Sequence, residues 1–169
     1  MVSDLTSLKA SVATFASSCA NKLRGQDAVA SEVTVFLCSN RFREDLPQYG
    51  NSATVPFFTP TSDTLEITRA ALRIVERIYK PGIMYKKSGV IVGGIMPMTH
   101  IQTDLFDPIQ NRPGRYRLMK AVDAINHRYG LKTLQLAVEG EKRQAWKVKS
   151  EHRSPNYLTD LNEILTVRI

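Results

Sequence analysis

Residues 31–39, Ser-Glu-Val-Thr-Val-Phe-Leu-Cys-Ser, decide the fold of this chain. An aliphatic side chain stands at every second position, which predicts a strand with at least one buried face. Residues 51–59 predict a second strand, and the long loop 40–50 joins the two as a hairpin. Pro56 has no N–H to donate to a ladder, so the second strand should lie at a sheet edge or carry a bulge. One side of the first strand carries the aliphatic residues Val33, Val35 and Leu37, and the other side carries Thr34, Phe36 and Cys38.

Two amphipathic helices are predicted beside these strands. The Ser-Asp pair at residues 3–4 offers good N-caps for the first helix, whose apolar residues recur at helical spacing until Gly25. The turn at residues 59–63, Thr-Pro-Thr-Ser-Asp, delivers a second capped helix. Lys-Pro-Gly at residues 80–82 ends that helix.

Residues 1–98 therefore read helix, strand, strand, helix, strand. The third strand is predicted at residues 85–95, where the Gly-Gly pair 93–94 marks its end. Because each helix has a single apolar stripe, the predicted fold class is α+β, an antiparallel sheet with both helices on one face and the other face free. Three strands make a thin sheet, so we expect a first strand before Val2, in sequence that this chain does not contain.

The second half of the chain predicts a linker and a small α/β extension. Residues 99–114 form the linker. Within the extension, residues 115–169, a helix is predicted at 115–129 and a strand at 133–138. Residues 145–149 and 164–169 are candidates for further strands.

Composition narrows the function classes. The 169 residues are 43% hydrophobic, enough for a real core, and a net charge of +7 suggests a polyanionic partner. Basic residues are in excess in both halves, so neither half is a charged tail. Cys19 and Cys38 are isolated thiols, which fits a reducing cytoplasm and argues against a zinc or disulfide framework. No membrane-length apolar run or signal segment is present, so we expect a soluble chain without a membrane partner.

The signatures of catalysis and metal binding are missing. No glycine-rich phosphate loop has the required spacing, and the three histidines fall in different segments. No two carboxylates are expected on neighbouring strands where they could hold Mg²⁺. We therefore expect this chain to hold no metal or other cofactor and not to be an enzyme by itself.

A short linear segment, residues 101–107, stands between the two halves and reads Ile-Gln-Thr-Asp-Leu-Phe-Asp. Leu105 and Phe106 point to opposite sides of an extended backbone, so one domain buries both only by wrapping around them. A partner's groove takes both if the peptide lies along it. From the residues alone, two interpretations stay open: the pair covers the edge of its own domain, or it binds a partner.

Several blocks of sequence occur in the order seen in UmuC-type Y-family DNA polymerases, the catalytic subunits of polymerase V, and the chain resembles that family. The resemblance covers nearly the whole chain but only the C-terminal part of such a polymerase, without palm, fingers, thumb and the first strand of the little finger. The blocks are residues 49–55, 59–63, 85–90, 102–106, 112–114, and Trp146 with 154–157.

The resemblance implies that residues 1–98 are most of a little-finger domain, whose free sheet face grips primer-template DNA. Sequence-independent gripping needs cations, small hydroxyls and backbone N–H groups aimed at phosphates. The Mg²⁺ of the family belongs to its catalytic domain. The residues expected to supply these DNA-contacting groups are Arg41, Arg43, Asn51, Ser52, Thr54, Lys86, Lys87 and Ser88.

The family also implies a role for the linear segment. It is similar to the peptide with which bacterial polymerases bind the β sliding clamp, with Gln102 in a polar subsite and Leu105 and Phe106 in an apolar pocket. The parent enzyme would be an error-prone translesion polymerase of the bacterial cytoplasm, acting in SOS DNA repair and mutagenesis. The alternative is a protein-interaction module without direct DNA binding.

For residues 115–169 the resemblance gives little mechanism. The expected partners are a UmuD-type accessory subunit and a RecA-type filament. A DNA-touching appendix is the other interpretation, because Arg112, Arg115, Arg117 and Lys120 lie in a stretch without acids. Trp146 is expected to anchor a small core rather than to stack on a base.

Overall fold

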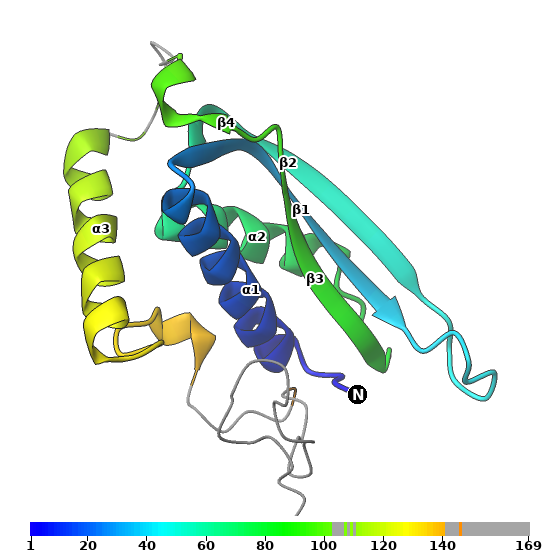
Figure 1. Ribbon diagram of the computed structural model, residues 1–169. Helices are drawn as coiled ribbons and strands as arrows, with labels where there is room; N and C mark the ends of the chain where they lie inside the picture. The colour runs from blue at the N-terminus through cyan, green and yellow to red at the C-terminus, as the bar shows by residue number, and fades with distance from the viewer. Residues whose placement is uncertain (103–106, 108, 110, 141–145, 147–169) are drawn as a thin grey trace, which may run out of the picture.

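The structure, a computed structural model, describes residues 1–102, 107, 109, 111–140 and 146 (Figure 1). Two long helices lie against an antiparallel sheet, and a third helix stands beside them. In chain order the elements are α1 (Leu5–Gly25), β1 (Ala28–Ser39), β2 (Gly50–Thr61), α2 (Thr64–Ile78), β3 (Tyr85–Gly93), β4 (Met96–Pro97), the 3₁₀ turn η1 (Met98–His100), α3 (Arg112–Tyr129) and the 3₁₀ turn η2 (Ala137–Glu139).

Local capping sets the starts of α1 and α2. The Asp4 carboxylate accepts a hydrogen bond of 2.7 Å from the backbone N–H of Ser7. The Asp63 carboxylate accepts from the N–H of Leu65 at 2.8 Å and from that of Glu66 at 3.3 Å. Each cap satisfies N–H groups that have no partner inside the helix. Both helices are confirmed close to the predicted bounds.

The sheet has the order β2-β1-β3, with β4 paired to the start of β1. Pro56 lies on an edge strand, and the β1–β2 register shifts between Ala30 and Glu32, so the prediction drawn from Pro56 is confirmed. The expected third strand ends at Gly93, since Gly94 takes a φ of 57° and redirects the chain into β4. At the other end of β3, Val2 makes one antiparallel bridge with Tyr85.

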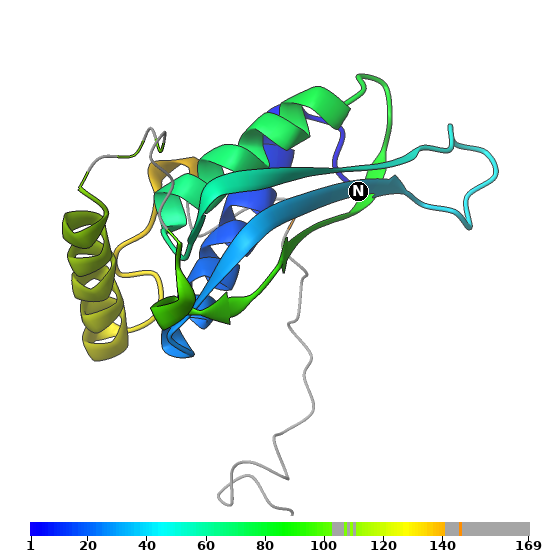
Figure 2. The same ribbon diagram turned by 90° about the horizontal axis from the view of Figure 1, so that it is seen from above.

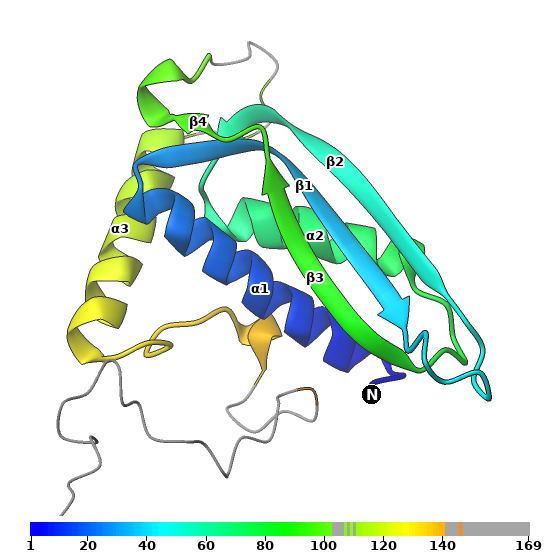
Figure 3. The same ribbon diagram turned by 45° about the vertical axis from the view of Figure 1, so that its right-hand side comes forward.

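The core lies between the sheet and the helices α1 and α2, which cover one face (Figures 2 and 3). Val33, Val35 and Leu37 of β1 are fully buried there, as the alternating sequence predicts. No described helix covers the opposite face. The predicted α+β class, with two helices on one face of an antiparallel sheet, is therefore confirmed.

The helix α3 and η2 run back along α1. Among the described residues of α3, Met119 alone is buried. Farther along the chain, Glu139 accepts a hydrogen bond of 2.7 Å from the Ser17 hydroxyl. The Trp146 ring meets Phe15 edge to face, with centroids 5.7 Å apart. The described part of the C-terminal extension therefore contacts α1 through η2 and Trp146, and Trp146 takes part as an anchor.

The strand predicted at residues 133–138 is wrong. The Asn126 side chain donates to the Leu134 carbonyl at 3.0 Å and accepts from the Leu134 N–H at 2.8 Å. These two bonds satisfy the backbone groups that a strand partner would have taken. The further strands predicted at 145–149 and 164–169 lie outside the described residues, apart from Trp146.

Candidate nucleic-acid interface

The uncovered face of the sheet is defined by the register of β1. Residues directly opposite in an antiparallel pair share a face, so the positions that flank Thr34, Phe36 and Cys38 line this face. The Thr34 and Thr54 hydroxyls lie 2.7 Å apart on it. Glu32 lies on the same face, with Pro56 and Gly93 opposite it. The four cross-strand rows are Pro56-Glu32-Gly93, Thr54-Thr34-Ile91, Ser52-Phe36-Gly89 and Gly50-Cys38-Lys87.

An apolar strip crosses the same face. A Cβ atom at Gly89 would lie 2.4 Å from ring atoms of Phe36, so the missing side chain lets the Phe36 ring lie across β3. Ile91 is 55% exposed and Phe58 is 67% exposed. The paired strand residues of the uncovered face therefore offer hydroxyls and flat apolar surface, with the acid Glu32 toward one end and Lys87 toward the other.

The basic residues gather at one end of this face. Lys87 stands opposite Cys38, and Lys86 sits at the register shift that follows. Arg41 and Arg43 are exposed in the hairpin loop that leaves β1 at this same end. Arg43 donates two hydrogen bonds, of 2.7 and 2.6 Å, to the Asp45 carboxylate, so part of its charge is matched locally. The four predicted cations therefore form a basic cluster at the hairpin end of the sheet and are not spread along the strands.

Two residues predicted for DNA contact lie on the other side of the sheet. Asn51 and Ser88 both pair with the buried Leu37, which places them on the helix-covered side. The Ser88 hydroxyl lies 3.1 Å from the Ser11 hydroxyl of α1. Asn51 donates to the Tyr49 hydroxyl at 3.1 Å at the edge of the hairpin. Of the eight predicted residues, Ser52, Thr54 and Lys87 face outward and Arg41, Arg43 and Lys86 adjoin them.

The segment predicted to bind a clamp begins at the far end of the sheet. Gln102 is exposed just after η1, and β4 before it pairs with the start of β1. Leu105 and Phe106 lie outside the described residues, so their role stays a prediction. In the part of the chain that is described, no group of three His, Cys, Asp or Glu side chains could hold a metal ion. No described helix combines the length and the apolar character needed to cross a membrane.

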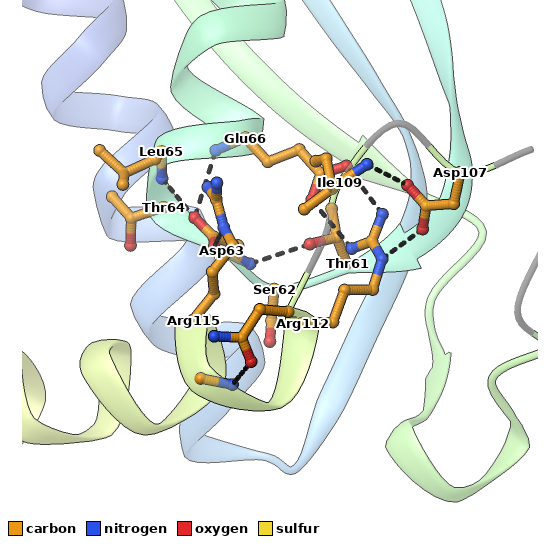
Figure 4. A network of polar contacts seen from close by, with 12 residues as sticks. Thr61, Ser62, Asp63, Thr64, Leu65, Glu66, Asp107, Ile109, Arg112 and Arg115 are labelled. Atoms are coloured by element: carbon orange, nitrogen blue, oxygen red, sulfur yellow. Dashed lines mark hydrogen bonds and ion pairs between the residues drawn. The ribbon is translucent and has the colours of Figure 1, made fainter.

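A network of ion pairs that sequence reasoning missed fixes α3 to the domain (Figure 4). Arg115 donates to the Asp63 carboxylate at 2.6 Å, so the residue that caps α2 also holds the first turn of α3. Arg112 binds Asp107 and reaches Glu66 with an N–O distance of 3.2 Å. The Arg112 hydrogen bond lowers the pKa of Asp107 well below its usual range.

Arg24 is the most buried arginine of this network. Its side chain is only 4% exposed and donates two hydrogen bonds to Asp123, of 2.6 and 2.8 Å. It also donates to the Ser62 carbonyl at 2.6 Å and to the Thr64 hydroxyl at 2.9 Å. Burial raises the pKa of Asp123, but the hydrogen bond and charge of Arg24 outweigh it, and the pKa is lowered.

The network changes one interpretation of the extension. Arg112 and Arg115 were two of the four cations expected to touch DNA there, but both are paired with carboxylates. They hold α3 in place. A cavity of about 370 Å³, mostly apolar, remains between the first turns of α3, η1 and the end of β2. Arginine side chains span this gap, so α3 is held by charge more than by close packing.

Known proteins are similar to this chain over both of its parts. Residues 1–105 match the impB/mucB/samB family C-terminal domain, and residues 116–167 match a domain of unknown function (DUF4113). The chain is 34% identical to Protein UmuC of Salmonella typhimurium over 99% of its length and 39% of the relative. Against Protein MucB of Escherichia coli the identity is 31%, over 96% of this chain and 38% of the relative. Similarity to DNA polymerase IV of Moorella thermoacetica is 32% identity over 53% of this chain and 21% of the relative.

The chain belongs to the impB/mucB/samB family, and it spans about two fifths of the length of its UmuC and MucB relatives. The likeness to the C-terminal part of UmuC-type Y-family polymerases, inferred from the sequence blocks, is thereby confirmed. The Arg24–Asp123 pair joins the two matched regions, since Arg24 belongs to the first and Asp123 to the second.

Proposed function

We propose that this chain is the DNA-gripping and clamp-tethering C-terminal region of an error-prone translesion DNA polymerase that acts in SOS DNA repair and mutagenesis. The family membership supports the polymerase context. The observation that carries the DNA-binding role is the cluster of Arg41, Arg43, Lys86 and Lys87 at one end of an uncovered, hydroxyl-bearing sheet face.

In this proposal the basic cluster contacts backbone phosphates. Ser52 and Thr54 donate hydrogen bonds to neighbouring phosphates, and the strip around Phe36 and Ile91 packs against sugars. None of these contacts reads a base edge in a defined pattern, so binding is independent of sequence. Such a grip suits a polymerase that must move along damaged templates. No step of it requires a metal ion, and polymerisation with its Mg²⁺ is assigned to other domains of the family.

The clamp tether is proposed for Gln102, Leu105 and Phe106. Burying the Leu and Phe side chains in a clamp pocket would contribute roughly 1.5 to 3 kcal/mol each before ordering costs, which suits a weak and exchangeable tether. Gln102 leaves the domain at the end opposite to the basic cluster. A clamp and a phosphate backbone would therefore engage opposite ends of the domain.

Titration of labelled β clamp with this chain tests the tether. The double variant Leu105→Ala, Phe106→Ala should bind about a hundredfold more weakly or worse, since each lost side chain removes about 1.4 kcal/mol or more, a factor of ten. The matched control is Phe42→Ala with Leu131→Ala, which removes one exposed Phe and one exposed Leu elsewhere. Equal clamp binding by wild type and the Leu105/Phe106 variant would reject the tether.

The second candidate is a protein-interaction module without direct DNA binding. The exposed Ile91 and Phe58 on the uncovered face favour it, because exposed apolar patches mark protein contacts. Salt separates the two functions, since phosphate contacts weaken steeply with salt and apolar contacts do not. In either case the cellular setting proposed is the bacterial cytoplasm, with a UmuD-type subunit and a RecA-type filament as partners of residues 115–169.

A further inference from the structure

A groove runs along the outer side of α2, the side that faces away from the sheet. It lies between α2 and η2 and has a volume of about 360 Å³. Its floor is apolar, formed by Leu65 and Leu72 of α2 together with Leu136 and Val138. The opposite side of α2 is buried in the core, so this groove and the uncovered sheet face lie on different sides of the helix layer.

The rim of the groove is positively charged. Arg69 and Arg73 are exposed on successive turns of α2, and neither makes an ion pair among the described residues. The acid on the same rim, Glu76, is neutralised by Lys9 at 2.6 Å. A ligand above the apolar floor would therefore meet two free guanidinium groups, which bind carboxylates in a bidentate manner.

An unsatisfied hydroxyl lies in the same groove. The Thr68 side chain lines it and is only 2% exposed, yet its Oγ1 has no hydrogen-bond partner within the described part of the chain. Buried polar atoms are nearly always hydrogen-bonded, and an exception in a groove points to a functional contact. The oxygen is shielded in the observed side-chain conformation, and a rotation about χ1 would turn it toward the groove, where a bound backbone or polar side chain would satisfy it.

We propose that this groove binds an acidic amphipathic helix of a partner protein. Its apolar face would pack on the leucine floor, as amphipathic helices do in hydrophobic grooves. Its Asp and Glu residues would pair with Arg69 and Arg73. A nucleic acid would use the arginines but not the leucine floor, so the groove favours a peptide. Because the groove lies behind the sheet, the partner and DNA would bind at the same time.

The test uses a fluorescein-labelled amphipathic helix with leucines on one face and glutamates beside them, titrated with the full chain. The variant Arg69→Glu, Arg73→Glu should weaken binding by about tenfold or more, the range of close charge pairs at interfaces. Thr68→Val should weaken it by a smaller factor. The control is Arg77→Glu, which continues the same exposed row but does not line the groove. It should bind the peptide like wild type.

Three results would overturn the proposal. The first is equal loss of binding in Arg77→Glu, which would reveal general charge attraction. The second is equal binding of a peptide with lysines in place of the glutamates. The third is full competition by single-stranded DNA, which would make the groove a nucleic-acid surface. Melting curves by circular dichroism confirm that each variant is folded, and Thr68→Val reports on the groove without changing any charge.

Discussion

Replacing Arg24 tests whether charge holds α3 to the domain. Arg24→Met keeps much of the aliphatic stem but removes four hydrogen bonds, two of them to Asp123. Breaking a buried ion pair by removing one partner costs about 3–5 kcal/mol. Asp123 keeps 25% of its side chain exposed and can regain water, so we expect a loss of about 2–4 kcal/mol in the free energy of unfolding.

The partner variant sharpens the test. Asp123→Asn leaves Arg24 bound to the Ser62 carbonyl and the Thr64 hydroxyl, so we expect a smaller loss of about 1–2 kcal/mol. In the double variant the two losses should not add, and the coupling should reach about 1–2 kcal/mol. Arg43→Met is the matched control, because its pair with Asp45 is exposed and should contribute nothing measurable.

Urea unfolding followed by two probes is the assay. Trp146 is the single tryptophan and packs against Phe15, so its fluorescence reports on docking of the extension. Far-ultraviolet circular dichroism reports on the whole fold. In the Arg24 and Asp123 variants the fluorescence transition should move to lower urea than the circular dichroism transition. Additive losses, within about 0.5 kcal/mol, would refute the reasoning, because uncoupled residues do not share an interaction.

Three further predictions concern acid, the uncovered face and the groove. Burial raises the pKa values of Asp63 and Asp123, but their arginine partners outweigh it and hold both values below the ordinary range. The two ion pairs therefore stabilise the docking of α3 above about pH 4, and this stabilisation is lost as the pH falls through the lowered pKa values. Trp fluorescence followed from about pH 5 to about pH 2, a range that brackets the ordinary carboxyl pKa, should show this loss. A constant signal would contradict it. Gly89→Ala should cost about 1–3 kcal/mol in urea unfolding because the new Cβ displaces the Phe36 ring, and the added variant Phe36→Leu should restore part of the loss. Thr68→Val should raise the free energy of unfolding by about 1 kcal/mol by removing an unsatisfied hydroxyl, and a lower melting temperature would show that the oxygen has a partner.

The helices and the core strand were predictable because their signals are local. Asp4 and Asp63 cap helices whose first residues follow directly, and the period of two in β1 fixes which side is buried. The docking of α3 was not predictable. Arg24 and Asp123 lie 99 residues apart, and nothing in the sequence around either marks it as half of a buried pair.

The positions of the residues in the candidate interface were predictable only in part, and their contact with DNA stays a prediction. Arg41 and Lys87 lie at the same end of the sheet, because Arg41 follows the end of β1 and Lys87 pairs with Cys38 close to that end. Ser88 belongs to the predicted set because it carries a hydroxyl on an expected strand, but its side is fixed by register, and a shift of one residue reverses the face of a strand. The sequence showed the strands but not which residue of β3 lies opposite Leu37, so the side of Ser88 was open until the pairing was known.

The salt dependence of DNA binding tests the central claim most directly. Binding of a labelled primer-template should weaken linearly on a log–log plot against salt, and the variant Lys86→Ala, Lys87→Ala should lower the magnitude of that slope by roughly 1 to 2. The charge-matched control, Arg77→Ala with Arg128→Ala, removes two exposed cations from α2 and α3 and should keep the wild-type slope. An unchanged slope in the lysine variant, or an equal fall in the control, would contradict a phosphate grip at this end of the sheet.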